Sequence, residues 1–224
     1  MLTKRLSIAV IAILAVLVPM ASFADVPSLD RQLLEAAAAG DVGKVRDCLQ
    51  RGARVDARDT AQRTALLLAT RGNHLEAARA LIDAGADVNA KDAIQDSPYL
   101  YAGAEGRLDI LRLTLAHGAD VRSTNRYGGT ALIPASEHGH VETVRALIAA
   151  GVDVDHVNKL HWTALLEAII LNDGGPRQAE VVRQLVAAKA DVNLADGKGV
   201  TPLQHARRRG YAEIERILLA ADAR

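Results

Sequence analysis

Histidine is the residue type in this sequence best suited to binding a metal, and four of the seven histidines lie within 24 residues of one another. They are His138, His140, His156 and His161. Neutral imidazole rings are common metal ligands, so a metal or small-molecule site at these residues is one hypothesis. The other hypothesis is that each histidine has a separate structural role.

Other catalytic signatures are missing from the sequence. There is no phosphate-binding glycine loop, no nucleophile elbow and no pair of cysteines spaced to bind a metal. We therefore expect no enzyme activity, no catalytic residue, no metal and no cofactor. The single cysteine, Cys48, aligns with leucines of later helices and is predicted to be a core side chain.

Six arginines recur at one equivalent position along the chain: Arg46, Arg79, Arg112, Arg145, Arg183 and Arg216. An acidic residue stands three positions before each of the last five, and residues three apart on a helix are neighbours. This pattern favours a solvated row of local ion pairs, each worth about 0.3–0.5 kcal/mol. An anion-binding stripe is the alternative.

These residues are set in a repeat. Segments that begin "TAL", "SPY" or "TPL" open at Thr64, Ser97, Thr130, Thr163 and Thr201, at intervals of 33 residues and then once of 38. Thr or Ser before Ala or Pro is typical of a helix start. Asn or Gly about nine residues later predicts the helix end, at Asn73, Gly106, Gly139, Asn172 and Gly210. A second, antiparallel helix follows, because its apolar residues have helical spacing.

The repeat resembles the ankyrin repeat. The segments that carry the resemblance are "TPLQHA" at 201–206, "GHVETV" at 139–144 and "GADVN" at 85–89. It implies an all-α solenoid of about six stacked helix-turn-helix units with projecting β-turn loops. The expected units are 29–61, 62–94, 95–127, 128–160, 161–198 and 199–224. His74 and His140 stand where the family places a structural histidine, which favours the structural hypothesis for the histidines.

The fifth unit is the least regular. It contains five additional residues, within "LNDGGPRQAE", and has Lys189 where the other units have glycine in the turn that ends the second helix. The insertion is either a second contact surface or a tolerated loop, since surface insertions cost little. Lys189 is expected to cost about 1 kcal/mol of stability.

The N-terminus has the pattern of a secretory signal peptide, predicted to cover residues 1–24. Lys4 and Arg5 precede an apolar segment of 13 residues, which is too short to span a membrane, and small residues mark a cleavage site. The remaining chain has 25 basic and 27 acidic residues, so no nucleic-acid partner is expected. We expect a periplasmic monomer that does not contact the membrane after cleavage.

In ankyrin arrays the projecting turns and first helices line a concave binding face, so the resemblance implies that a protein partner binds there. At these positions the third to fifth units place large apolar and aromatic residues. The predicted partner-binding residues are Ile94, Tyr101, Tyr127, Leu160, His161, Trp162, Leu166 and Ile170. The expected function is that of an inhibitor, immunity or accessory factor for another exported protein.

Overall fold

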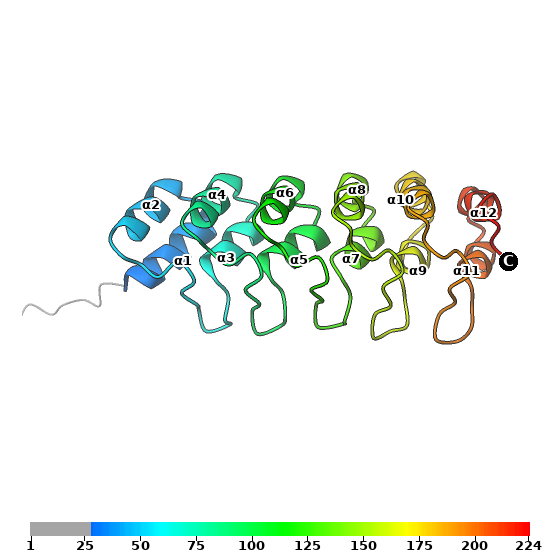
Figure 1. Cartoon of the computed structure of the whole chain (residues 1–224), viewed down its shortest axis with the longest axis horizontal. Coiled ribbons are helices and arrows are strands. Elements are labelled where there is room, and N and C mark those ends of the chain that lie inside the picture. Colours follow the sequence, from blue (N-terminus) through cyan, green and yellow to red (C-terminus); the bar gives the residue numbers. More distant parts are fainter. Residues whose placement is uncertain (1–27) are drawn as a thin grey trace, which may run out of the picture.

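A computed structural model describes residues 28–224, in which twelve α-helices form six pairs with loops that project to one side (Figure 1). The pairs are α1 (Leu29–Ala39) with α2 (Val42–Gln50), α3 (Ala65–Arg71) with α4 (Leu75–Asp83), α5 (Pro98–Ala104) with α6 (Leu108–Ala116), α7 (Leu132–Glu137) with α8 (Val141–Ala149), α9 (Ala164–Ile170) with α10 (Pro176–Ala187), and α11 (Pro202–Arg209) with α12 (Ala212–Leu219). This part of the chain has no strand, only an isolated bridge between Arg58 and Thr64. The expected all-helical solenoid is confirmed.

The core is a strip that runs through all six pairs. Each first helix contacts the first helix of the next pair, and the second helices do the same. One side chain from each first helix lies in this strip and is at most 1% exposed: Leu33, Leu66, Tyr99, Leu132, Leu165 and Leu203. Full burial of such a side chain contributes about 1.5–3 kcal/mol, so each unit depends on its neighbours for stability.

Two residues that replace core leucines are buried, and for Cys48 this confirms the prediction. Cys48 is 2% exposed, and burial raises the pKa of its thiol, which disfavours the reactive thiolate. Tyr99 is fully buried, and its hydroxyl has no hydrogen-bond partner. Burial therefore raises the pKa of Tyr99 as well.

The predicted helix starts are confirmed at four of five positions. The hydroxyls of Thr64, Ser97, Thr163 and Thr201 each accept a hydrogen bond from the third residue of the following helix. Thr130 does not, and its buried hydroxyl has no partner. The reason is Pro134, which has no N–H to bond to the Thr130 carbonyl as the equivalent residues do in the other units. Helix α7 consequently begins late, at Leu132.

The predicted turn residues adopt the left-handed conformation in four units and not in the fifth. Asn73, Gly106, Gly139 and Gly210 have φ of 56° to 71°. The helix end predicted at Asn172 is confirmed, because α9 ends at Ile170, but the insertion moves the left-handed position from Asn172 to Gly174, with φ of 69°. The Asn172 side-chain amide instead donates to the Glu167 carbonyl at 3.3 Å, at the end of α9.

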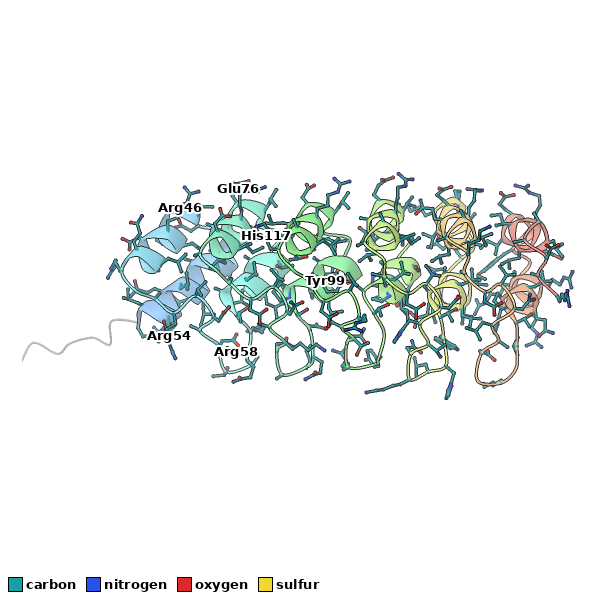
Figure 2. The ribbon with its side chains drawn as sticks, viewed as in Figure 1. Arg46, Arg54, Arg58, Glu76, Tyr99 and His117 are labelled. Carbon is teal, nitrogen blue, oxygen red and sulfur yellow. The ribbon has the colours of Figure 1, made fainter. Side chains whose placement is uncertain are left out.

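The row of arginines lies on the outer surface of the second helices, where Figure 2 labels Arg46 and Glu76. Local ion pairs join Arg79 to Glu76, Arg112 to Asp109, Arg145 to Glu142, Arg183 to Glu180 and Arg216 to Glu213. Arg183 also reaches Glu213 of the next unit at 3.0 Å. All these side chains are at least one-third exposed, so the expected solvated row is confirmed.

The structure says nothing of the predicted signal segment, because residues 1–24 lie outside the described part of the chain. Among the helices of residues 28–224, none is long and apolar enough to cross a membrane.

Lys189 occupies a backbone conformation that suits glycine. Its φ is 70°, and the equivalent residues Gly52, Gly85, Gly118 and Gly151 have φ between 82° and 93°. A side chain in the left-handed region costs about 1 kcal/mol or more. We predict that Lys189→Gly raises the free energy of unfolding by about 1 kcal/mol, measured by urea denaturation.

Gly151→Ala is the control, because a Cβ at Gly151 would meet no atom within 4 Å. Its effect therefore reports the backbone alone, and it should lower stability by about 1 kcal/mol. Equal stability of Lys189→Gly and the parent protein would contradict the backbone explanation.

Candidate functional site

The projecting loops share one internal support, an Asp or Asn five residues before each helix start. One side-chain oxygen of this residue accepts backbone N–H groups two and four positions later, at 2.9–3.1 Å. The five residues are Asp59, Asp92, Asn125, Asn158 and Asp196. Such side-chain turns fix the backbone locally. The backbone at each loop tip is therefore held in a fixed conformation.

Neighbouring loops are also joined to each other. The Ala93 amide donates to the Ala61 carbonyl at 3.0 Å, and the Lys159 amide donates to the Tyr127 carbonyl at 2.9 Å. The His156 ring bonds to the Gly128 carbonyl at 2.6 Å. The bonds of Lys159 and His156 hold the tip of the fourth-unit loop against that of the third, next to the predicted site.

The structure brings five of the predicted binding residues together around Trp162. Tyr127 and Leu160 are 50% and 52% exposed at successive loop tips, and Trp162 is half-buried. His161 and Ile170 line the neighbouring surface with Leu160 and Trp162. Leu171, at the end of α9, adds a side chain that is 47% exposed.

The other predicted residues do not join this group. Ile94 is 46% exposed, but it lies on the loop before α5 and does not line the surface on either side of Trp162. The ring of Tyr101 lies under the Arg71 guanidinium, 4.7 Å from the ring centroid. The prediction that Leu166 binds a partner is wrong, because its side chain is fully buried and has no surface to offer a partner.

Leu166 is buried because its position in the helix faces the core. Its N–H donates to the Thr163 hydroxyl at 3.2 Å, which places it in the first turn of α9. The equivalent residues of the three preceding units, Leu67, Leu100 and Ile133, are at most 3% exposed, whereas Gln204 of the sixth unit is exposed. The first helices therefore offer a binding surface mainly at the later residues Ile170 and Leu171.

A cavity of about 200 Å³ lies between the loops on either side of α7 and α8, and we call it the Trp162 cavity. Its lining residues are Asn125, Tyr127, Gly129, Ile133, Pro134, Glu137, Asn158, Leu160, Trp162, Glu167 and Leu171. Most of them are apolar or aromatic. Two are carboxylic acids: Glu137 is partly exposed, whereas Glu167 is buried, which is unusual for an acid.

Glu167 is the more buried of the two acids, with 5% of its surface exposed. Asn158 donates a side-chain hydrogen bond to it at 2.8 Å, while the Asn158 oxygen supports the loop that carries Leu160 and Trp162. Burial, reinforced by the nearby Glu137 charge, raises the pKa of Glu167 to about 7. The Asn158 bond and His138 act in the opposite direction.

A second hollow, of about 530 Å³, lies on the other side of Trp162, toward the sixth unit. It is lined by Leu160, His161, Trp162, Ile170, Asp196, Gly197, Lys198, Val200, His205 and Arg208. His205 bonds through Nε2 to the Asp196 carboxylate at 2.9 Å. Trp162 thus stands between an acidic cavity and a hollow with several basic groups.

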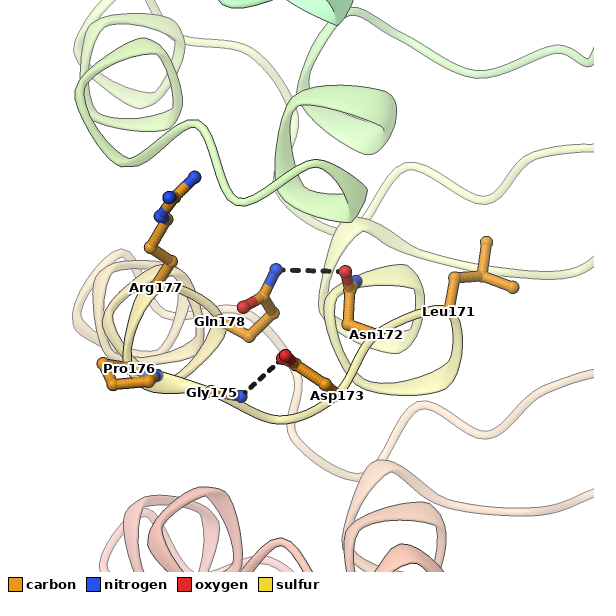
Figure 3. A pocket seen from close by; sticks show the side chains of 7 residues that line it. All are labelled: Leu171, Asn172, Asp173, Gly175, Pro176, Arg177 and Gln178. Carbon is orange, nitrogen blue, oxygen red and sulfur yellow. Dashed lines mark hydrogen bonds between the residues drawn. The ribbon is translucent and has the colours of Figure 1, made fainter.

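The insertion in the fifth unit forms a third hollow, lined by residues 171–173 and 175–178 (Figure 3). Gln178 donates to Asn172 at 3.0 Å, and the Gly175 amide donates to Asp173 at 2.9 Å. The Tyr211 hydroxyl of the sixth unit donates to the Asn172 carbonyl. A Cβ on Gly174 would lie only 2.4 Å from the Tyr211 ring, so the insertion packs closely onto the next unit.

The histidines do not converge. The rings of His138 and His140 meet edge to face with centroids 5.6 Å apart, but His138 bonds to the Ala104 carbonyl and His156 to that of Gly128. His74 similarly bonds to the Ala38 carbonyl at 3.1 Å. Over residues 28–224, no three His, Cys, Asp or Glu side chains are grouped so that they could hold a metal ion.

Sequence reasoning did not single out Glu137, Asn158 or Glu167. A signal was present for two of them. Asn158 belongs to the regular row of Asp and Asn residues before the helix starts. Glu167 occupies a position where the second, third, fourth and sixth units have Leu68, Tyr101, Pro134 and His205, and the other acid in this row, Glu35 of the first unit, is exposed rather than buried.

The raised pKa of Glu167 predicts a pH-dependent stability. The folded protein keeps the proton at pH values where the unfolded chain, with a pKa of 4.5, has released it, so the free energy of unfolding falls as the pH rises from 4.5 to about 7. Glu167→Gln has no carboxyl to titrate at this position. Its free energy of unfolding should therefore rise by about 2–3 kcal/mol relative to that of the parent protein between pH 4.5 and about pH 7. Urea denaturation at pH 4.5 and pH 8 measures the difference.

The matched control is Glu142→Gln, which alters an exposed carboxyl on the outer surface. It should follow the profile of the parent protein. A constant difference between Glu167→Gln and the parent over this pH interval would show that Glu167 does not titrate as described.

Comparisons with known proteins agree with this geometry. Models of ankyrin repeats match residues 33–82 (many copies) and residues 99–196 (three copies). An ankyrin repeat domain from Acinetobacter baumannii AYE is 63% identical, with a TM-score of 0.83, over 86% of this chain and 98% of that one. The ankyrin repeat protein EF0377 is 44% identical, with a TM-score of 0.82, over 85% of this chain and 97% of that one.

Among curated proteins, the ankyrin repeat protein YahD of Escherichia coli K12 is 50% identical over 58 residues. This match covers 26% of the chain and only 29% of YahD. The repeat spacing, the stacked helix pairs and the two similar solved structures lead to one conclusion: the chain belongs to the ankyrin-repeat family.

Proposed function

We propose that this protein is a non-enzymatic protein-interaction module of the periplasm, acting as an inhibitor, immunity or accessory factor for another exported protein. Ankyrin repeats generally mediate protein–protein interaction. The observation that carries the proposal is the cluster of exposed apolar side chains around Trp162.

This cluster has the composition of a binding hot spot. Tyr127, Leu160 and Leu171 are about half exposed and surround the half-buried Trp162. Aromatic and apolar anchors next to polar groups contribute most of the affinity in protein interfaces. Contiguous exposed apolar residues mark interaction sites, whereas single exposed apolar residues are common on protein surfaces.

The location is proposed from the N-terminal sequence. Lys4, Arg5, the apolar segment and the small residues up to Ala24 have the order of a secretory signal. The mature chain would then begin at Asp25. Its partner would be another protein of the same compartment.

We predict that Trp162→Ala weakens binding of the cognate protein by at least about 2 kcal/mol, roughly 30-fold, with little change in melting temperature. The partner is captured from a periplasmic extract and its affinity is measured by calorimetry. A variant with Tyr127, Leu160 and Trp162 all changed to Ala should capture none.

Leu219→Ala is the matched control, because Leu219 is 45% exposed but lies on α12, away from the cluster. It should bind like the parent protein. A large loss of stability with unchanged affinity in Trp162→Ala would instead assign Trp162 to the core and contradict the proposal.

Export is tested separately. When the full chain is expressed in a Gram-negative host, we expect the periplasmic fraction to contain a protein that begins at Asp25, identified by intact mass and N-terminal sequencing. An uncleaved chain in the cytoplasmic fraction would contradict the proposed location. It would not contradict the proposed binding surface, which the capture experiment tests.

A further inference from the structure

The two carboxylic acids of the Trp162 cavity lack a basic partner. Within residues 28–224, neither Glu137 nor Glu167 forms an ion pair with Lys, Arg or His. The side-chain hydrogen bond to Glu167 comes from Asn158, a neutral amide. The cavity therefore holds acidic groups whose charge the chain itself does not balance.

The stack does not require an acid at this position. The equivalent residues Leu68, Tyr101 and His205 occupy the first turn of their helices without a carboxylate, and so does Pro134 in α7. Burying an ionisable acid without a counter-charge costs folding free energy. Glu167 is thus an acid that the fold does not need, placed in a cavity, and this indicates a role in binding.

Three basic residues that adjoin lining residues of the cavity in the sequence make other contacts. The Arg126 guanidinium covers one face of the Tyr127 ring, 4.7 Å from its centroid. The Lys159 amine donates to the Arg126 carbonyl at 3.0 Å. His138 bonds through Nδ1 to the Ala104 carbonyl at 2.8 Å. None of them is paired with Glu137 or Glu167.

The remaining lining suits the stem of a long basic side chain. Trp162, Leu160, Leu171 and Ile133 are apolar, and the indole face of Trp162 favours a nearby cation. Lys and Arg have apolar stems that pack on such surfaces while their charged ends reach polar groups. A volume of about 200 Å³ admits one side chain and no folded segment.

We propose that the Trp162 cavity receives one lysine or arginine side chain of the protein partner. Its charged end lies against Glu167 and Glu137, and its stem packs against Leu160 and Trp162. This inference rests on the proposed function and deepens it, because it specifies a partner whose contact surface carries a protruding basic residue beside apolar ones. The occupant follows from charge complementarity, since an apolar side chain would leave both acids unpaired.

The test uses the single tryptophan of the sequence as a reporter, because its indole N–H gives one NMR signal. The probes are the N-acetyl, N-methylamide derivatives of lysine and arginine, with the norleucine derivative as the uncharged control. They are added to the mature protein at pH 8. We expect saturable shifts of the Trp162 signal with both basic probes, and binding at least about tenfold weaker with norleucine.

The protein variants separate charge from shape. Glu167→Gln keeps the size of the side chain and should weaken lysine binding at least about tenfold, while Glu137→Gln, at a more exposed residue, provides an independent second variant. Glu142→Gln, on the outer surface, should bind like the parent protein.

Equal shifts with lysine and norleucine would overturn the inference, and so would unchanged lysine binding in both Glu167→Gln and Glu137→Gln. Absence of any shift with the basic probes would also overturn it. These results do not depend on capturing a partner, whereas the triple alanine variant tests the apolar contacts. Failure of this inference and failure of the proposed function are therefore distinguishable.

Discussion

The burial of each helix pair against its neighbours is the constraint on which the rest of the structure depends. A single pair has one apolar side that it cannot cover by itself, so the pairs stack, and one side chain per unit fills the shared strip from Leu33 to Leu203. Stacking at a fixed repeat also brings equivalent residues into rows. The arginines of the second helices form one such row, and the Asp and Asn residues that support the projecting loops form another.

The same constraint separates stability from recognition. Core positions must stay apolar, and the loop supports must accept two backbone hydrogen bonds, but the loop tips are free to vary. In this chain the tips at Tyr127 and Leu160, with Trp162 behind them, combine exposed apolar surface with a buried acid. Departures from the repeat are concentrated here and in the adjoining insertion, where Asn172 and Gly174 pack against Tyr211.

Much of the fold could be predicted from the sequence, because the caps, turn residues and apolar spacing recur from unit to unit and support one another. The errors arose where one unit differs from the others. Pro134 removes the hydrogen bond that would have started α7 at Thr130, and the insertion shifts the left-handed residue from Asn172 to Gly174. The candidate site was less predictable. Leu166 shares a helix with Ile170 but faces the core, and the burial of Glu167 depends on a loop from the neighbouring unit, which periodicity along one helix does not reveal.

The central claim is that the loop side of the third to fifth units, around Trp162, is the surface that binds a partner protein. Site-specific photo-crosslinking in living cells tests it most directly, with a benzophenone amino acid placed at Tyr127 or Leu160 and, for comparison, at Arg112 or Arg145 on the outer surface. The account predicts one discrete crosslinked species from the two loop positions and none from the two arginine positions. The same species from the arginine positions, with none from the loop tips, would contradict it.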